Sequence, residues 1–170
     1  MKKFLFFTKV FLLGMVFLPG FCYGADPAEG FWISVDDKSG KATAGWEVYI
    51  NGDLLFGRIL SVAGHPQDVK AVKCKDSYRG FPLSGKVSDM TVTGTPWIFN
   101  LSPDKPGVWS GGQIIDPNDG GMYKCRITFR PRDGKKYMTD TLEMRGEIGL
   151  GIGRSQFWQK CSREEAAALR

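Results

Sequence analysis

The chain has 170 residues, a formal net charge of +5 and 42% hydrophobic residues. This length fits a single domain with a sizeable core. Lys2, Lys3 and Lys9 are the only charged residues among the first 24, so the remainder carries a net charge of only about +2. A mixed balance of this size excludes a strongly electrostatic partner, and we therefore expect no nucleic-acid binding.

Residues 1–24 have the pattern of a secretory signal peptide, because the three lysines flank a short apolar run over residues 10–18. That run is too short and wrongly flanked for a membrane-spanning helix. We place the cleavage site after Gly24, with cleavage after Ala25 as the alternative. Phe21 stands before Cys22, where a bacterial lipoprotein signal needs a small residue. We therefore expect a periplasmic or secreted protein that is not a lipoprotein, with no transmembrane segment in the mature chain.

Short strand patterns separated by turn signals follow the leader. Residues 43–50 alternate, with Ala44, Trp46, Val48 and Ile50 on one face, as expected for a half-buried strand. Asn51-Gly52 then predicts a tight hairpin with a type I′ turn. The strands expected in this half of the chain are residues 30–35, 43–50, 54–62 and a less regular one over 83–92.

Two long connections interrupt this pattern. Residues 64–80 form a polar loop, in which we interpret the single histidine, His65, as a surface residue. Residues 93–107 contain three prolines and predict an irregular excursion with an apolar tip, Trp97-Ile98-Phe99. This tip either docks on the folded domain or forms an exposed contact patch.

The clearest hairpin pattern lies in the second half of the chain. Residues 109–115 and 122–130 flank a turn rich in Asp, Pro, Asn and Gly. The second of these strands alternates Tyr123, Cys125, Ile127 and Phe129 with polar residues. The remaining elements expected are strands over residues 141–148 and 154–161 and a short helix or frayed tail over residues 162–170.

About eight short strands joined by turns predict an all-β fold. An antiparallel up-and-down barrel over residues 25–161 is the simplest topology, and a sandwich is the alternative. The interior of an eight-stranded barrel is either filled by side chains or holds one small ligand.

The mature chain keeps three cysteines, an odd number for an exported protein. Cys125 lies on the apolar face of its strand and is most simply a small buried residue. Cys74 and Cys161 are the pair that we consider for a disulfide. No cysteine or histidine spacing indicates a metal site, and we expect no cofactor.

Seven short motifs follow the predicted strands in a fixed order, and their order and spacing are more specific than any one of them. The motifs are Gly30-x-Trp32, Gly57-x-Ile59, Arg79-x-x-Pro82-Leu83-x-Gly85, Gly112-x-Ile114-x-Asp116-Pro117-x-x-Gly120, Tyr123-x-Cys125, Leu142-x-x-Arg145-Gly146 and Gly153-Arg154-x-x-x-Trp158. Over residues 27–161 this pattern resembles the bacterial family named domain of unknown function 2147 (DUF2147). The resemblance implies a small exported protein with a lipocalin-like β-barrel, and it implies no established activity.

A barrel with an interior cavity would bind a small apolar or amphipathic molecule, such as a fatty acid or another lipid-like compound. The aromatic residues that could line or close this cavity are Trp32, Trp46, Trp109, Tyr123 and Trp158. Arg79, Arg145 and Arg154 could bind a carboxylate or phosphate head group, because guanidinium groups bind such anions through two hydrogen bonds. The same aromatic residues are equally compatible with a plain core, and an arginine on the outer face would be solvated.

Two other classes of function remain as alternatives. A ligand-free structural or interaction module of the bacterial envelope would use the Trp97-Ile98-Phe99 tip as its contact surface. An enzyme is not expected, because His65 has no nucleophile-elbow motif beside it. Asp116 and Glu147 could form a carboxylate pair, but Asp116 opens an Asp-Pro turn in which its side chain caps the backbone.

Overall fold

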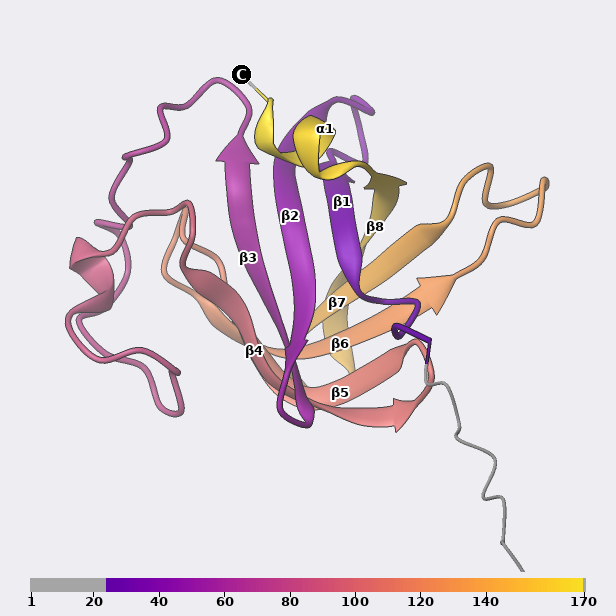
Figure 1. Cartoon of the computed structure of the whole chain (residues 1–170). Helices are drawn as coiled ribbons and strands as arrows, with labels where there is room; N and C mark the ends of the chain where they lie inside the picture. Colours follow the sequence, from indigo (N-terminus) through magenta and orange to yellow (C-terminus); the bar gives the residue numbers. More distant parts are fainter. Residues whose placement is uncertain (1–23, 170) are drawn as a thin grey trace, which may run out of the picture.

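Eight antiparallel strands close into a barrel in which each strand pairs with its neighbour in sequence and β8 pairs with β1 (Figure 1). The structure is a computed structural model that describes residues 24–169. The strands are β1 (Gly30–Val35), β2 (Ala42–Asn51), β3 (Leu54–Val62), β4 (Pro96–Lys105), β5 (Val108–Ile115), β6 (Met122–Arg130), β7 (Thr141–Gly149) and β8 (Ile152–Cys161). The up-and-down barrel is therefore confirmed and the sandwich is excluded. Apart from Gly24, the predicted signal peptide lies outside the described residues.

The β2–β3 hairpin is present, but its turn differs from the prediction. Asn51 pairs with Leu54, so Gly52 and Asp53 are the two central residues of the turn. Only Gly52 has a positive φ, of 62°, whereas a type I′ turn needs a positive φ at both central positions. Glycine at the first central position with a positive φ is the pattern of a type II′ turn, which also matches the twist of the strands.

The fourth strand lies elsewhere than predicted. Residues 83–92 contain only the 3-10 helix η1 (Val87–Asp89), and the predicted excursion over residues 93–107 is β4 with its turn. The prolines misled the prediction, because proline removes a ladder hydrogen bond inside a sheet. Here Pro96 begins the strand and Pro103 lies beside a register shift, two positions where the sheet tolerates proline.

The apolar run in β4 is buried on both faces of the sheet. Trp97, Ile98 and Phe99 are each 0% exposed. Ile98 packs against Gly57 inside the barrel, while Phe81 packs against the rings of Trp97 and Phe99. A strand covered on both sides has no polar face and therefore shows no alternation. The exposed contact patch proposed for these residues is thus excluded.

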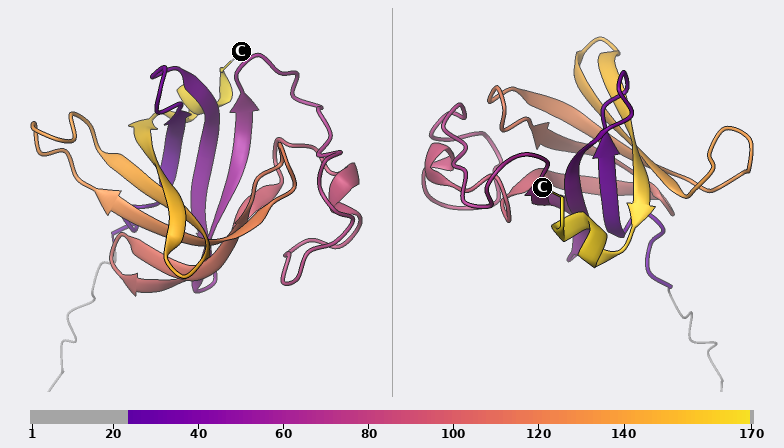
Figure 2. Two further views of the ribbon diagram at one scale, coloured as in Figure 1. Left: turned by 180° about the vertical axis from the view of Figure 1, so that it is seen from behind. Right: turned by 90° about the horizontal axis from the view of Figure 1, so that it is seen from above.

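Phe81 belongs to the long connection between β3 and β4, residues 63–95, which packs beside one end of the barrel (Figure 2). Several hydrogen bonds tie this connection to the rest of the barrel. The Trp97 Nε1 donates to the Val92 carbonyl at 2.7 Å, and the Tyr78 hydroxyl donates to the Gly120 carbonyl at 2.8 Å. Ala71 and Val87 are both 1% exposed, so the connection contributes its own residues to the core.

The opposite end of the barrel is sealed by the residues that precede β1. The Asp26 carboxylate accepts hydrogen bonds from Trp109 Nε1 at 3.1 Å and from the Gly107 amide at 3.0 Å. Trp32 Nε1 donates to the Ala28 carbonyl at 3.1 Å, and the Lys160 ammonium lies 4.3 Å from the centre of the Trp32 ring. We call this sealed end the base and the other end the mouth.

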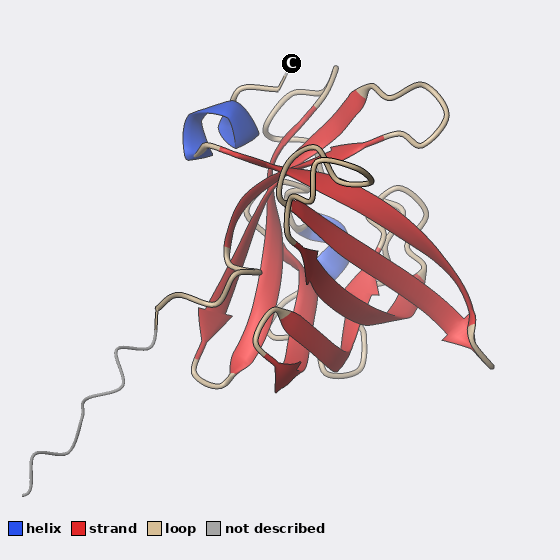
Figure 3. Ribbon diagram, turned by 90° about the vertical axis from the view of Figure 1, so that its right-hand side faces the viewer, coloured by secondary structure: helices blue, strands red, loops and turns tan. Residues whose placement is uncertain are grey.

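The helix α1 (Arg163–Ala167) packs against β2 and also contacts β1 and β3 (Figures 1 and 3). The Ser61 hydroxyl donates to the Ala166 carbonyl at 2.6 Å. A Cβ atom at Gly45 would lie only 1.7 Å from the same carbonyl oxygen, so only glycine allows this approach. The predicted short terminal helix is confirmed. Within residues 24–169, no helix has the length and apolar character needed to span a bilayer.

Candidate functional site

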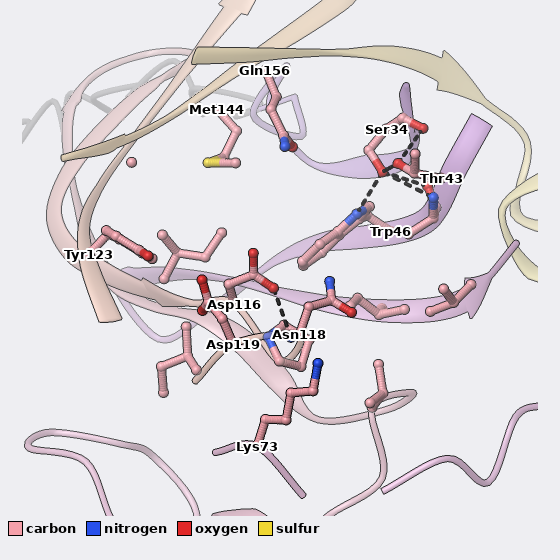
Figure 4. Close-up of a pocket in the computed structure, with 18 of the residues that line it drawn as sticks. Ser34, Thr43, Trp46, Lys73, Asp116, Asn118, Asp119, Tyr123, Met144 and Gln156 are labelled. Carbon is pink, nitrogen blue, oxygen red and sulfur yellow. Dashed lines mark hydrogen bonds between the residues drawn. The ribbon is translucent and has the colours of Figure 1, made fainter. Parts of the chain in front are cut away.

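A cavity of about 980 Å³ opens at the mouth of the barrel (Figure 4). Its rim is formed by the β5–β6 turn, by the adjoining ends of β7 and β8, and by the connection that follows β3. Its inner wall comes from β1, β2, β3, β5, β6, β7 and β8, so it is a property of the whole barrel. The wall residues with the largest side chains are Trp46, Ile59, Ile114, Tyr123, Met144 and Gln156.

The cavity exists because small residues occupy inward positions near the mouth, where large ones fill the base. Ser34, Ala44 and Gly146 line the cavity from β1, β2 and β7. In β1, the next inward position toward the base is occupied by Trp32, which is 0% exposed. Inward positions repeat every second residue, so this change in side-chain size along one face divides the interior into a filled part and an open part.

One side of the wall carries a hydroxyl network. Ser34 Oγ lies 2.8 Å from Thr43 Oγ1 and donates to the Ala44 carbonyl at 3.1 Å. The Trp46 Nε1 donates to Ser34 Oγ at 3.3 Å, which fixes the indole in the wall (Figure 4). This network places neutral polar atoms beside an aromatic ring, as ligand pockets commonly do.

Two further neutral polar side chains, Gln156 and Tyr123, point into the cavity from β8 and β6 (Figure 4). The Gln156 Oε1 accepts a hydrogen bond from Trp158 Nε1 at 3.2 Å, which orients the amide. The amide nitrogen of Gln156 donates to no other residue in the described part of the chain, so it can bind a ligand atom. Donors at these two positions could bind an oxygen of a small molecule.

The β5–β6 turn brings two carboxylates to the rim beside Tyr123 (Figure 4). Asp116 Oδ1 accepts from the Asn118 amide at 2.9 Å, and Asp119 Oδ1 accepts from the Gly121 amide at 2.7 Å. The predicted capping role of Asp116 is therefore confirmed. The charge of Asp119 raises the pKa of the Tyr123 hydroxyl, and burial and the charge of Asp116 raise it further. The turn thus places two negatively charged side chains beside this hydroxyl.

The structure divides the predicted aromatic residues into two groups. Trp46 and Tyr123 line the cavity. Trp32 and Trp158 are 0% exposed and Trp109 is 4% exposed, and none of the three lines the cavity. Trp158 stacks on Trp46 with ring centres 4.6 Å apart, so it supports the cavity wall from the filled side. For Trp32, Trp109 and Trp158, the plain core interpretation holds.

The three predicted arginines do not form one site, and this corrects the proposed anion-binding group. Arg145 lies on the outer face of β7, where its Nε is 2.6 Å from Glu147 Oε1. Arg79 is exposed in the β3–β4 connection and does not line the cavity. Only Arg154 reaches the rim, and its guanidinium is paired with Asp37 at 2.8 Å.

Sequence reasoning missed several wall residues, in particular Ser34, Met144 and Gln156. Each lies two residues from a tryptophan or leucine that is buried deeper in the same strand, so strand alternation already places it inside the barrel. The prediction selected large aromatic and charged residues and passed over the small and neutral ones.

His65, predicted to lie on the surface, is exposed, and it also belongs to the cavity rim.

Cys74, Cys125 and Cys161, the cysteines of the described residues, are free thiols, so the disulfide considered for Cys74 and Cys161 is not formed. Cys74 is buried in the β3–β4 connection against the turn at Gly120, while Cys161 ends β8 beside α1. Burial raises the pKa of the Cys161 thiol to about 11 and also raises that of Cys74. Cys125 is 3% exposed, which confirms it as a small core residue.

Comparisons with known proteins agree with this geometry. The model of the family described as "Uncharacterized protein conserved in bacteria (DUF2147)" matches residues 30–160. A solved structure from Helicobacter pylori, whose protein is described as belonging to the lipocalin family, is similar with a TM-score of 0.63 and 15% sequence identity. The match covers 84% of this chain and 88% of that chain, and at this identity it shows a shared fold. No protein with a curated description matches the chain.

Proposed function

Because the chain belongs to the DUF2147 family and folds as a lipocalin-like barrel, we propose that it is a carrier for a small apolar or amphipathic molecule. The observation that carries this proposal is the cavity of about 980 Å³ at the mouth. Ligand pockets typically have volumes of about 300–1,000 Å³ and apolar walls with a few polar groups. The wall formed by Trp46, Ile59, Ile114 and Met144 with the polar Gln156 fits this description.

Export is part of the same proposal. The support is the pattern of residues 1–24, with its lysines, its short apolar run and its small residue at the expected cleavage site. An exported carrier would bind its ligand in the periplasm or outside the cell. We expect no catalysis, because the carboxylate of Asp116 is engaged in its own turn and the inner wall presents neutral side chains.

The ligand-free interaction module is the less favoured alternative. Its contact surface was to be Trp97-Ile98-Phe99, and these side chains are buried in β4. This alternative also assumes a filled barrel, whereas open space separates Tyr123 and Met144 from Ser34 and Trp46 across the mouth (Figure 4).

The first test is native mass spectrometry of the mature protein purified from the periplasm, followed by extraction of any bound small molecule. We expect a near-stoichiometric amphipathic compound, or uptake of one when it is added. A clean mass without any uptake would contradict the carrier proposal. Isolation of the protein from the cytoplasm with an intact leader would contradict export alone.

A cavity-filling variant provides a sharper test. A Cβ atom at Gly146 would have its nearest neighbour, Tyr123 Cβ, at 3.6 Å, an ordinary contact distance, so a larger side chain can extend into the cavity. Gly146→Leu should therefore abolish ligand uptake while the protein stays folded. Lys124→Leu places the same side chain on the exposed outer face of β6 and should leave uptake unchanged. Equal uptake by both variants would show that the ligand binds elsewhere.

A further inference from the structure

The charged and the uncharged polar residues of the cavity lie at different depths. The inner wall carries the hydroxyls of Ser34, Thr43 and Tyr123 and the amide of Gln156. Among the described residues, the charged side chains and the histidine that line the cavity all come from the turns, the β3–β4 connection and the mouth end of β8. They are His65, Lys70, Lys73, Asp116, Asp119 and Arg154.

The positive charges on the rim are poorly placed to bind an anion inside the cavity. The Arg154 side chain is 67% exposed and already paired with Asp37. Lys70 and Lys73 are exposed residues of the β3–β4 connection and lie at the rim, outside the inner wall. A carboxylate that entered the cavity would thus lose its hydration without gaining a cation in the inner wall, which is unfavourable.

The negative charges act more directly on the cavity. Asp116 and Asp119 flank Tyr123, and their charges raise the pKa of its hydroxyl because they disfavour the phenolate. The two carboxylates at this rim position also repel the carboxylate of an entering ligand.

We propose that the cavity selects an uncharged amphiphile, with a hydroxyl, ester or amide head group, and that Asp116 and Asp119 exclude fatty acids and other anionic amphiphiles. This inference rests on the carrier function proposed above and specifies its ligand. The head group would bind the Gln156 amide nitrogen and the Tyr123 hydroxyl, and its apolar chain would lie against Trp46, Ile114 and Met144.

The test compares three probes with the same apolar chain: dodecanol, dodecanoate and dodecylammonium. Their affinities would be measured with the mature protein by displacement of the neutral fluorophore 1-N-phenylnaphthylamine, at about pH 8, where a carboxylic acid is ionised. We expect dodecanol to bind on the order of tenfold more tightly than dodecanoate. Preference for dodecanoate or for dodecylammonium would overturn the inference. Failure of all three probes and of the fluorophore to bind would instead overturn the carrier function.

Two variants test the residues named. The double variant Asp116→Asn/Asp119→Asn keeps side chains that can cap the turn and should raise dodecanoate affinity on the order of tenfold, with little change for dodecanol. Asp119→Asn alone should give a smaller gain in the same direction, and it serves if the double variant does not fold. Asp53→Asn, in the β2–β3 turn at the base, is the matched control and should change neither affinity.

Tyr123→Phe removes only the hydroxyl and should weaken dodecanol binding by about 2- to 10-fold, the effect of one hydrogen bond. An unchanged dodecanoate affinity in the double Asp variant would show that the two carboxylates do not select the ligand. An unchanged dodecanol affinity in Tyr123→Phe would remove this hydroxyl from the head-group site.

Discussion

The two ends of the barrel use the same strands for opposite purposes. At the base, inward positions hold large apolar side chains such as Trp32, Ile127 and Leu142, each 0% exposed, and the Asp26 carboxylate closes the end. At the mouth, the inward positions hold Ser34 and Gly146, and a cavity remains. Strand pairing and alternation are the same at both ends, so the size of the inward side chain alone decides whether the interior is core or binding site.

This difference implies that stability and binding are carried by separate residues. Substitutions at the base should change the free energy of unfolding and leave the cavity intact. Substitutions at the mouth should do the reverse, because a wall residue that already faces open space loses few contacts when it is truncated. The following predictions test this division, in order of decreasing expected effect.

Trp158→Ala should cause the largest loss of stability, about 3–5 kcal/mol, because Trp158 is 0% exposed and stacks on Trp46. Met144→Ala, at the cavity wall, should cost only about 1–2 kcal/mol, since open space already lies on one side of the residue. Urea unfolding of both variants measures the difference. Equal losses would contradict the division between a filled base and an open mouth.

Asp26→Ala should lower the free energy of unfolding by about 1–3 kcal/mol, because it leaves the donors of Trp109 and Gly107 without their acceptor at the sealed end. Ligand affinity should not change, since Asp26 does not line the cavity. Asp26→Asn keeps one acceptor oxygen and should lose less. A change in ligand affinity without a change in the free energy of unfolding would show that the base is energetically coupled to the mouth.

Leu150→Gly should have the smallest effect and the opposite sign, a gain of about 0.5–1 kcal/mol. Leu150 lies at the tip of the β7–β8 hairpin with φ of 50° and is fully exposed, so it bears the cost of a left-handed backbone without any packing. Thermal unfolding would measure the gain. A loss of stability would indicate that the leucine side chain has a contact in solution that the monomer does not provide.

Much of the fold could be predicted from the sequence, because alternation and turn chemistry are local signals. The β5–β6 hairpin was predicted with nearly its observed bounds, and a terminal helix was one of two alternatives given for the last residues. β4 could not be found in this way, because Trp97 and Phe99 are covered by a connection that comes earlier in the chain. Only the three-dimensional arrangement shows that this strand has two buried faces.

The site was predicted less well, for a physical reason. A cavity consists of space that side chains leave free, and a sequence displays only the side chains that are present. Trp46 and Tyr123 were identified because aromatic residues are conspicuous, whereas Gly146 and Ser34 create the volume. Arg145 pairs with Glu147 on the outer face of β7. That both residues face outward follows from strand alternation, so this part could have been predicted from the sequence.

The hydroxyl of Tyr78 has a consequence for chain entropy. It accepts a hydrogen bond from the Lys75 amide at 2.9 Å and donates to the Gly120 carbonyl at 2.8 Å, near the middle of the connection over residues 63–95. This tie divides one long loop into two shorter ones, and each then closes at its own modest entropic cost. Doubling the length of a flexible loop costs only about 0.6 kcal/mol, so each half could lengthen or shorten with little effect on the barrel while Tyr78 holds its place.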